Sequence, residues 1–166
     1  MTTIYIDGDA CPVRDETYTV AARYGLSVIV VSNGSRPIRP PEQSFVTMVT
    51  VPEGADIADD WIAERIAAQD ICVTNDIPLA SRCLSRQALA LSSTGKNWTP
   101  DNIGNALAGR EIGRHLREMG VMTGGPRPLS GSDRSRFLQA LDTCVNAARR
   151  ASLTARLHRP MPPLPE

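Results

Sequence analysis

Short β-branched segments alternate with helical segments through the first hundred residues of this 166-residue chain. The run Ser-Val-Ile-Val-Val-Ser at 27–32 is typical of a buried strand, and the segments between such runs carry apolar residues at helical spacing. The predicted strands cover 3–7, 27–32, 45–51, 71–74 and 88–91, and the predicted helices between them cover 13–24, 56–68 and 77–86. Strands that alternate with helices predict an α/β fold, with a central, mostly parallel sheet and helices on both faces.

The pattern becomes helical beyond residue 98. Thr99-Pro100 supplies a capping residue and a proline suited to a first turn, and the predicted helix runs to about 119. Ser132-Asp133 begins a last predicted helix that reaches about 151. We therefore expect a single domain over 1–151, followed by a proline-rich, disordered tail over 152–166.

Composition argues against membrane proteins and small zinc domains. No apolar run approaches the ~18 residues that a membrane span requires, and the amino-terminal segment lacks the pattern of a signal peptide. We therefore expect a cytoplasmic protein without membrane contacts. The four cysteines lack the paired short spacing of a zinc site and are predicted to be small buried residues.

A net charge of zero conceals opposite charges in the two parts of the chain. Residues 1–80 carry five basic and twelve acidic side chains, whereas residues 81–166 carry thirteen basic and six acidic ones. Carboxylates that hold cations beside arginines that hold phosphate would explain this division. Two oppositely charged parts that simply pack together would explain it equally well.

Two carboxylates follow the first predicted strand, where the chain leaves the core. Asp7 and Asp9 come directly after the apolar run Ile-Tyr-Ile, and Asp76 follows the strand at 71–74. If these two strands are neighbours, Asp7 and Asp76 leave the same edge of the sheet about 4.8 Å apart and repel each other. A divalent cation with oxygen ligands would relieve that repulsion. Asp76 is also well placed to cap the following helix.

A second group of acids opens the helix predicted at 56–68. Asp56 and Asp59 share one side of that helix, and Asp60 is expected to face solvent. Asp56 can serve either as a metal ligand or as a helix cap, because aspartate is favoured at both places. Asp59 is the better ligand candidate because it lies too far into the helix to cap it.

Two further sets of polar residues are candidate substrate contacts. Asn33 and Ser35 leave the second predicted strand and either contact a phosphate or form a plain turn. Arg110, Arg114 and Arg117 recur at helical spacing, and they form either a solvated face or a set of phosphate contacts.

Five motifs in order give the chain a specific resemblance. They are Asp7-Gly-Asp9-Ala-Cys11-Pro12, Asn33-Gly-Ser35, Gly54-Ala-Asp56-Ile-Ala-Asp59, Thr74-Asn-Asp76-Ile-Pro78-Leu-Ala80 and Thr123-Gly-Gly-Pro126. Over about residues 1–150 the chain resembles the YaiI/YqxD family of uncharacterised bacterial proteins. That family in turn resembles the PIN-like nucleases, which hydrolyse RNA with Mg²⁺ or Mn²⁺ held by acidic residues.

The resemblance implies a PIN-like three-layer sandwich and assigns roles to individual acids. Asp7 matches the first acid of the PIN pattern, Asp76 matches the acid after the fourth strand, and Asp56 or Asp59 stands where a helical glutamate is usual. A clear fourth acid is missing, so Asp9 is the candidate replacement. The implied function is metal-dependent hydrolysis of RNA by Asp7, Asp9, Asp59 and Asp76, with Asp56 as a further candidate metal ligand.

Two other functions remain open at this stage. One is a noncatalytic RNA-binding or regulatory protein that retains the fold. The other is a haloacid-dehalogenase-like phosphatase in which Asp7 becomes phosphorylated. The phosphatase reading lacks support downstream, because the single lysine, Lys96, precedes no second acidic pair.

Overall fold

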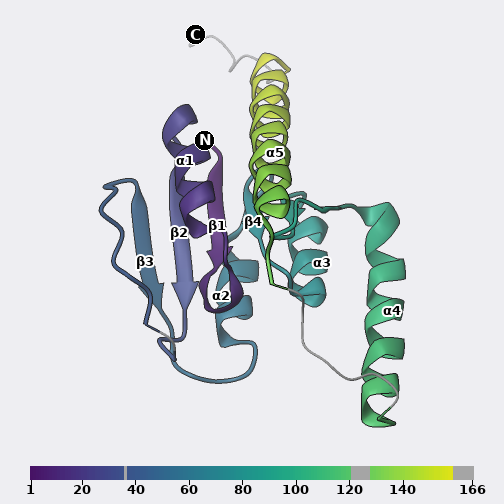
Figure 1. Ribbon diagram of the computed structural model, residues 1–166. Coiled ribbons are helices and arrows are strands. Elements are labelled where there is room, and N and C mark those ends of the chain that lie inside the picture. The colour runs from purple at the N-terminus through teal and green to yellow at the C-terminus, as the bar shows by residue number, and fades with distance from the viewer. Residues whose placement is uncertain (36, 121–127, 159–166) are drawn as a thin grey trace, which may run out of the picture.

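The computed structural model describes residues 1–35, 37–120 and 128–158. These residues form one sheet of six strands in the order β3-β2-β1-β4-β5-β6 (Figure 1). The strands are β1 (Thr3–Asp7), β2 (Ser27–Ser32), β3 (Val46–Thr50), β4 (Ile71–Val73), β5 (Leu89–Leu91) and β6 (Asn97–Trp98). All neighbours pair in parallel except β5 and β6, which are antiparallel. The predicted α/β class is confirmed, and β4 is the neighbour of β1, as the candidate site requires.

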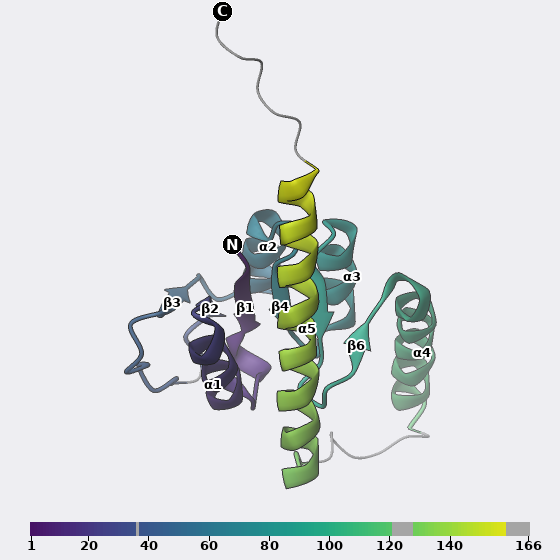
Figure 2. The same cartoon turned by 90° about the horizontal axis from the view of Figure 1, so that it is seen from above.

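Helices cover both faces of the sheet, which gives the predicted three layers. The helices are α1 (Arg14–Tyr24), α2 (Ile57–Arg65), α3 (Ile77–Ser85), α4 (Pro100–Glu118) and α5 (Gly131–Leu157), with a 3-10 turn, η1, at Gly8–Ala10. α1 and α5 pack on one face, and α2 and α3 pack on the other. α4 packs against α3 beyond the β6 edge, standing out to one side in Figure 2.

Alternation along the strands divides the core between the two faces. In β1, Ile4 and Ile6 pack with α1 and α5, whereas Tyr5 packs with α2 and α3. The same rule continues one residue further and places Asp7 on the α2 and α3 face.

The four cysteines, all within the described residues, are buried free thiols, as predicted.

Several predicted boundaries differ from the structure. α2 ends at Arg65 rather than 68, because Ile66 turns to an extended conformation and the Asp70 carboxylate accepts a bond from the Ala67 N–H. The last helix continues to Leu157, six residues beyond the predicted end, so the first residues assigned to the tail are helical. The short strand β6 was not predicted.

Some expectations lie outside the described residues. The Thr123–Pro126 motif and the end of the proline-rich tail, 159–166, fall there. No helix within the described ranges is long and apolar enough to cross a membrane.

Candidate acidic site at the carboxyl ends of the strands

Asp7 ends β1 with its side chain half-buried. The Thr74 hydroxyl, on the neighbouring strand position, donates to Asp7 Oδ2 at 3.3 Å. Burial raises the pKa of Asp7, the Thr74 bond opposes that rise, and the charges of Asp76 and Asp9 add to it. The carboxylate therefore lies where a nearby positive charge would stabilise its ionised form.

Asp76 caps α3, as predicted. Its Oδ1 accepts the Leu79 N–H at 2.9 Å, and its own N–H donates to the Thr74 hydroxyl at 2.9 Å. Thr74 thus connects the two acids: it donates to one and accepts from the backbone of the other. The cap uses Oδ1, and no hydrogen bond from the described residues reaches Oδ2, so this oxygen is available to a ligand.

Asp59 lies in the first turn of α2 and is half-buried. Burial raises its pKa to about 7, and the charges of Asp76, Asp7 and Asp56 add to the rise, with Arg82 opposing it. Three carboxylates from β1, α2 and α3 therefore interact electrostatically at one end of the sheet. The sequence predicts a cluster of four carboxylates with Asp9 as the fourth member, and the role of these acids as metal ligands stays a prediction.

Asp9 has a different environment from Asp7. Its two carboxylate oxygens accept from the Ser32 hydroxyl at 2.8 Å and from the Asn33 N–H at 2.9 Å. The intervening Gly8 is close-packed, since a Cβ there would lie 2.8 Å from Val30 Cγ1. Asp9 therefore fastens η1 to the end of β2, and its charge reaches the acidic site only through its effect on Asp7.

Asn33 and Ser35 form the plain turn that was one of their two expected roles. Asn33 Oδ1 accepts the Ser35 N–H at 2.9 Å, which is an Asx turn. Asn33 is half-buried and Ser35 is exposed.

Asp56 precedes α2 and acts on the group of Asp7, Asp59 and Asp76 only through its charge near Asp59, and Asp60 is engaged by Arg82. Asp56 is exposed and forms no capping hydrogen bond within the described residues, so the cap predicted as one of its roles is wrong. Its left-handed backbone conformation, with φ 63°, replaces the extended conformation that a capping aspartate normally has. Asp60 is exposed, as predicted, and pairs with Arg82 at 2.6 Å.

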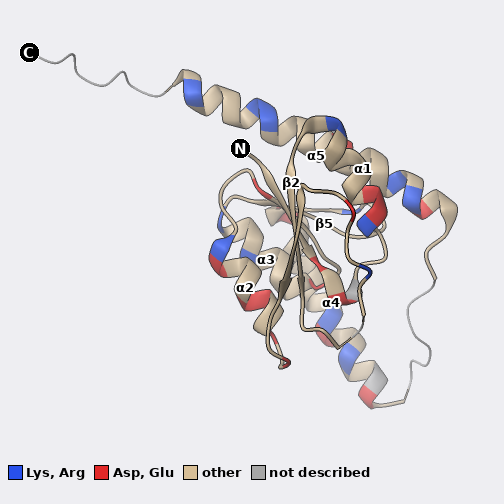
Figure 3. Cartoon of the chain, turned by 90° about the vertical axis from the view of Figure 1, so that its left-hand side faces the viewer, with Lys and Arg blue, Asp and Glu red and all other residues tan. Residues whose placement is uncertain are grey.

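The predicted arginine face lies on α4. Arg110 and Arg114 are exposed, and the Arg117 side chain is outside the described part of the chain. Figure 3 shows basic positions along the half of α4 that extends from the body. Ile103 and Leu107, in the other half, pack against α3.

Sequence reasoning missed the polar residues that connect the strand ends. Asn75 Nδ2 donates to Ser93 Oγ at 2.8 Å, and the Ser93 N–H donates to Asn75 Oδ1 at 2.9 Å. The available signal was a pair of serines, 92 and 93, directly after a predicted strand that neighbours the Asp76 loop. Thr74 carried a similar signal, as a hydroxyl at the end of a buried strand.

The side chains of the acidic site are suitable ligands for a divalent cation, but their present positions do not form a complete metal site. Carboxylate oxygens are the ligands that Mg²⁺ and Mn²⁺ prefer, and the mutual repulsion of Asp7, Asp59 and Asp76 is what a cation relieves. Within the described ranges, however, no three His, Cys, Asp or Glu side chains lie close enough together to hold a metal ion as they stand.

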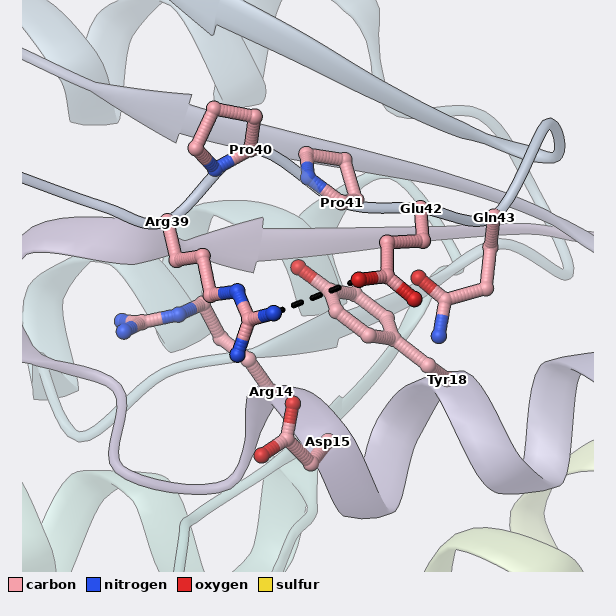
Figure 4. A pocket seen from close by; sticks show the side chains of 8 residues that line it. All are labelled: Arg14, Asp15, Tyr18, Arg39, Pro40, Pro41, Glu42 and Gln43. Atoms are coloured by element: carbon pink, nitrogen blue, oxygen red, sulfur yellow. Dashed lines mark hydrogen bonds and ion pairs between the residues drawn. The ribbon is translucent and has the colours of Figure 1, made fainter.

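A separate pocket of about 290 Å³ lies between α1 and the loop before β3 (Figure 4). Arg14, Tyr18 and Arg39 line it, and Arg39 pairs with Glu42 at 3.2 Å. None of the predicted site residues lines this pocket, and α1 is on the face opposite to Asp7, so the pocket is distinct from the acidic site.

Comparison with known proteins places the chain among uncharacterised bacterial proteins. A model of the uncharacterised YaiI/YqxD family matches residues 5–147. A UPF0178 protein of Paramagnetospirillum magneticum is 59% identical over 150 residues, which are 90% of this chain and 98% of the relative. A UPF0178 protein of Caulobacter sp. strain K31 is 57% identical, with the same shares covered. No solved structure matches. The chain belongs to the YaiI/YqxD family.

Proposed function

We propose that this protein hydrolyses phosphodiester bonds in RNA with Mg²⁺ or Mn²⁺ at Asp7, Asp59 and Asp76. The observation that carries the proposal is the placement of three acids at the carboxyl edge of a parallel sheet: Asp7 ends β1, Asp59 lies in the first turn of α2, and Asp76 caps α3 and shares the Thr74 hydroxyl with Asp7. That edge is where α/β folds bind ligands. The resemblance to PIN-like nucleases supplies the reaction class.

The three carboxylates would hold the metal, and the metal would supply an activated water and stabilise the charge that develops on the phosphate. Because they do not form a ready ligand set, the proposal includes a side-chain rearrangement on binding. Asp76 Oδ2 is available for this without loss of the cap bond made by Oδ1. Asp9 is left out of the ligand set, because both its oxygens are bonded at the end of β2.

Residues around the acids have supporting roles in the proposal. The Thr74 hydroxyl orients Asp7 by donating to Oδ2. The buried positions of Thr74 and Val73 keep bulk water from one side of the acids, which strengthens charge interactions there. The phosphate itself is repelled by the free carboxylates, so substrate affinity must come from basic residues elsewhere.

The test is cleavage of an unstructured RNA with added Mn²⁺ by the parent and by Asp7→Asn, Asp59→Asn and Asp76→Asn. We expect cleavage that chelator abolishes and that each substitution lowers by about 100-fold or more, the usual scale for loss of a group that stabilises transition-state charge. Asp60→Asn is the matched control, because it removes the neighbouring exposed acid of the same helix and should cleave like the parent.

Three outcomes would contradict the proposal. Metal-dependent cleavage that survives both Asp7→Asn and Asp76→Asn would place the reaction elsewhere. RNA binding by a parent that never cleaves would favour a noncatalytic RNA-binding protein. A phosphorylated Asp7 would favour the phosphatase chemistry.

A further inference from the structure

A polar groove of about 590 Å³ lies between the β5–β6 turn and the first turns of α5. Its charged lining residues are Lys96, Arg136 and Asp133. Asp133 is only 2% exposed and is occupied by Arg136 at 3.0 Å and by the Ser130 N–H. Lys96 is exposed and forms no ion pair with any described residue. The accessible charge of this groove is therefore positive.

The ammonium of Lys96 lies against an aromatic ring. Its nitrogen is 4.7 Å from the centre of the Trp98 ring. For an exposed ammonium such a cation–π contact is weak. The ammonium can therefore exchange this contact for an anion at small cost.

The turn that carries Lys96 is fixed from two sides. On the β4 side, Asn75 and Ser93 exchange hydrogen bonds of 2.8 and 2.9 Å. On the α5 side, Gly95 has φ +87°, and a Cβ there would lie 2.9 Å from the Arg136 carbonyl oxygen. The turn is thus held between the Asp76 loop and α5, and its position relative to the acidic site is set before any ligand binds.

Strand register places the backbone of Lys96 in line with that of Asp7 along the carboxyl edge of the sheet, with the groove on the α5 face of that edge and Asp7 on the α2 and α3 face. Ile6 pairs with Val73, and Val73 pairs with Leu91, so the next row contains Asp7, Thr74 and Ser92. The Ser92 N–H donates to the Lys96 carbonyl at 2.9 Å, which adds Lys96 to that row. Three strand spacings separate the backbones of Asp7 and Lys96, which is about 14 Å.

We propose that this groove binds a backbone phosphate of the same RNA strand whose phosphodiester bond lies at the acidic site, a few nucleotides away, with Lys96 as the principal cation. The inference rests on the proposed function for the identity of the strand. It answers the question of affinity that the acidic site raises, because the carboxylates repel phosphate and the fixed groove along the same edge attracts it.

The experiment measures binding of a short, unstructured, fluorescein-labelled oligoribonucleotide in chelator over a range of salt concentrations. Lys96→Gln should lower the slope of log affinity against log salt by about 0.7, which corresponds to one phosphate contact on a single strand. If the two proteins bind equally at 1 M salt, the variant then binds about fivefold more weakly than the parent at 0.1 M salt. Lys96→Arg keeps the charge and should retain the parent slope.

The matched control is Arg150→Gln, which removes an exposed arginine from the same helix as Arg136, about 21 Å further along its axis. This control should bind like the parent. The proposal is overturned if Lys96→Gln has the parent slope, or if the parent does not bind the oligonucleotide. It is also overturned if inorganic phosphate binds the parent but not Lys96→Gln while the oligonucleotide binds both proteins equally, which would identify the groove as a site for free phosphate.

Cleavage by the same proteins separates this inference from the proposed function. If the parent cleaves RNA and Lys96→Gln binds it like the parent, the proposed function stands and the role of the groove is contradicted. If the parent binds RNA through Lys96 without cleaving it, the role of the groove stands and the proposed function is contradicted.

Discussion

The Thr74 hydroxyl donates to the Asp7 carboxylate at 3.3 Å while it accepts the Asp76 N–H at 2.9 Å. One buried side chain, directly after β4, therefore connects the end of β1 to the start of α3. Thr74 is 3% exposed, so neither partner can readily replace it with water.

Thr74→Val should destabilise the fold, because it leaves the Asp76 N–H without its acceptor and Asp7 without its donor. We expect a loss of about 1–3 kcal/mol in the free energy of unfolding, measured by denaturant titration. Thr74→Ser keeps the hydroxyl and should lose less. An equal loss in both variants would show that the methyl group, and not the hydroxyl, is what matters.

Asp59 should make the metal-free protein less stable as pH rises. Its pKa is about 7 in the folded state and near 3.8 when unfolded, so between these values the folded state binds more protons. Its contribution to stability is therefore fully present below about pH 4 and is lost as pH rises through about 7.

Asp59→Asn should remove this pH dependence and melt higher than the parent at pH 8 in chelator. Because Asp59 is half-exposed, we expect a difference of only about 1 kcal/mol, or about 2–4 °C, by calorimetry. Asp60→Asn should lack the effect. A lower melting temperature for Asp59→Asn at pH 8 would contradict the charge repulsion assigned to Asp59.

Asp76 has a structural role and a proposed metal-binding role that two substitutions separate. Asparagine is as good a helix cap as aspartate, so Asp76→Asn should fold with near-parent stability and lose metal-dependent cleavage. Asp76→Ala should lose cleavage and, in addition, about 1 kcal/mol of stability. Denaturant titration beside the cleavage assay distinguishes them, and a destabilised Asp76→Asn would mean that the charge itself supports the fold.

Asp9 should behave as a structural acid. In Asp9→Asn an amide N–H₂ replaces one of the two oxygens that accept hydrogen bonds, and the Asn33 N–H can only donate. We therefore expect a loss of about 1–2 kcal/mol in the free energy of unfolding. Its affinity for Mn²⁺, measured by titration calorimetry, should stay close to that of the parent, whereas Asp7→Asn should bind weakly. Equal losses of Mn²⁺ affinity in the two variants would restore Asp9 to the ligand set.

Periodicity was sufficient for much of the architecture. The β-branched runs at 3–7 and 27–32 are strands at those residues, because a parallel strand that is buried on both faces has a nearly continuous apolar sequence. The cap at Asp76 was also predictable, since the acid, the turn and the proline at the helix start are all local. The position of β4 beside β1 followed from the usual strand order of such folds and was confirmed.

Features that depend on distant partners were not predictable in the same way. β6 has two residues and exists because Ala90 and Leu91 pair with it, and a segment that short carries no period. The end of α2 depends on Asp70, whose carboxylate accepts from Ala67 and also from Thr3, which is 67 residues away.

The pair Asp7 and Asp9 shows most clearly the difference between what local sequence determines and what the tertiary structure determines. Local sequence is enough to place both acids at the mouth of a buried strand, because apolar residues enter the core and carboxylates leave it. It cannot separate their roles, because these depend on which polar groups β2, β4, α2 and α3 bring to them. Folding places Ser32 and Asn33 against Asp9, and Thr74, Asp59 and Asp76 around Asp7. A hydrogen bond or a charge interaction acts over a few ångströms of space, whatever the distance along the chain.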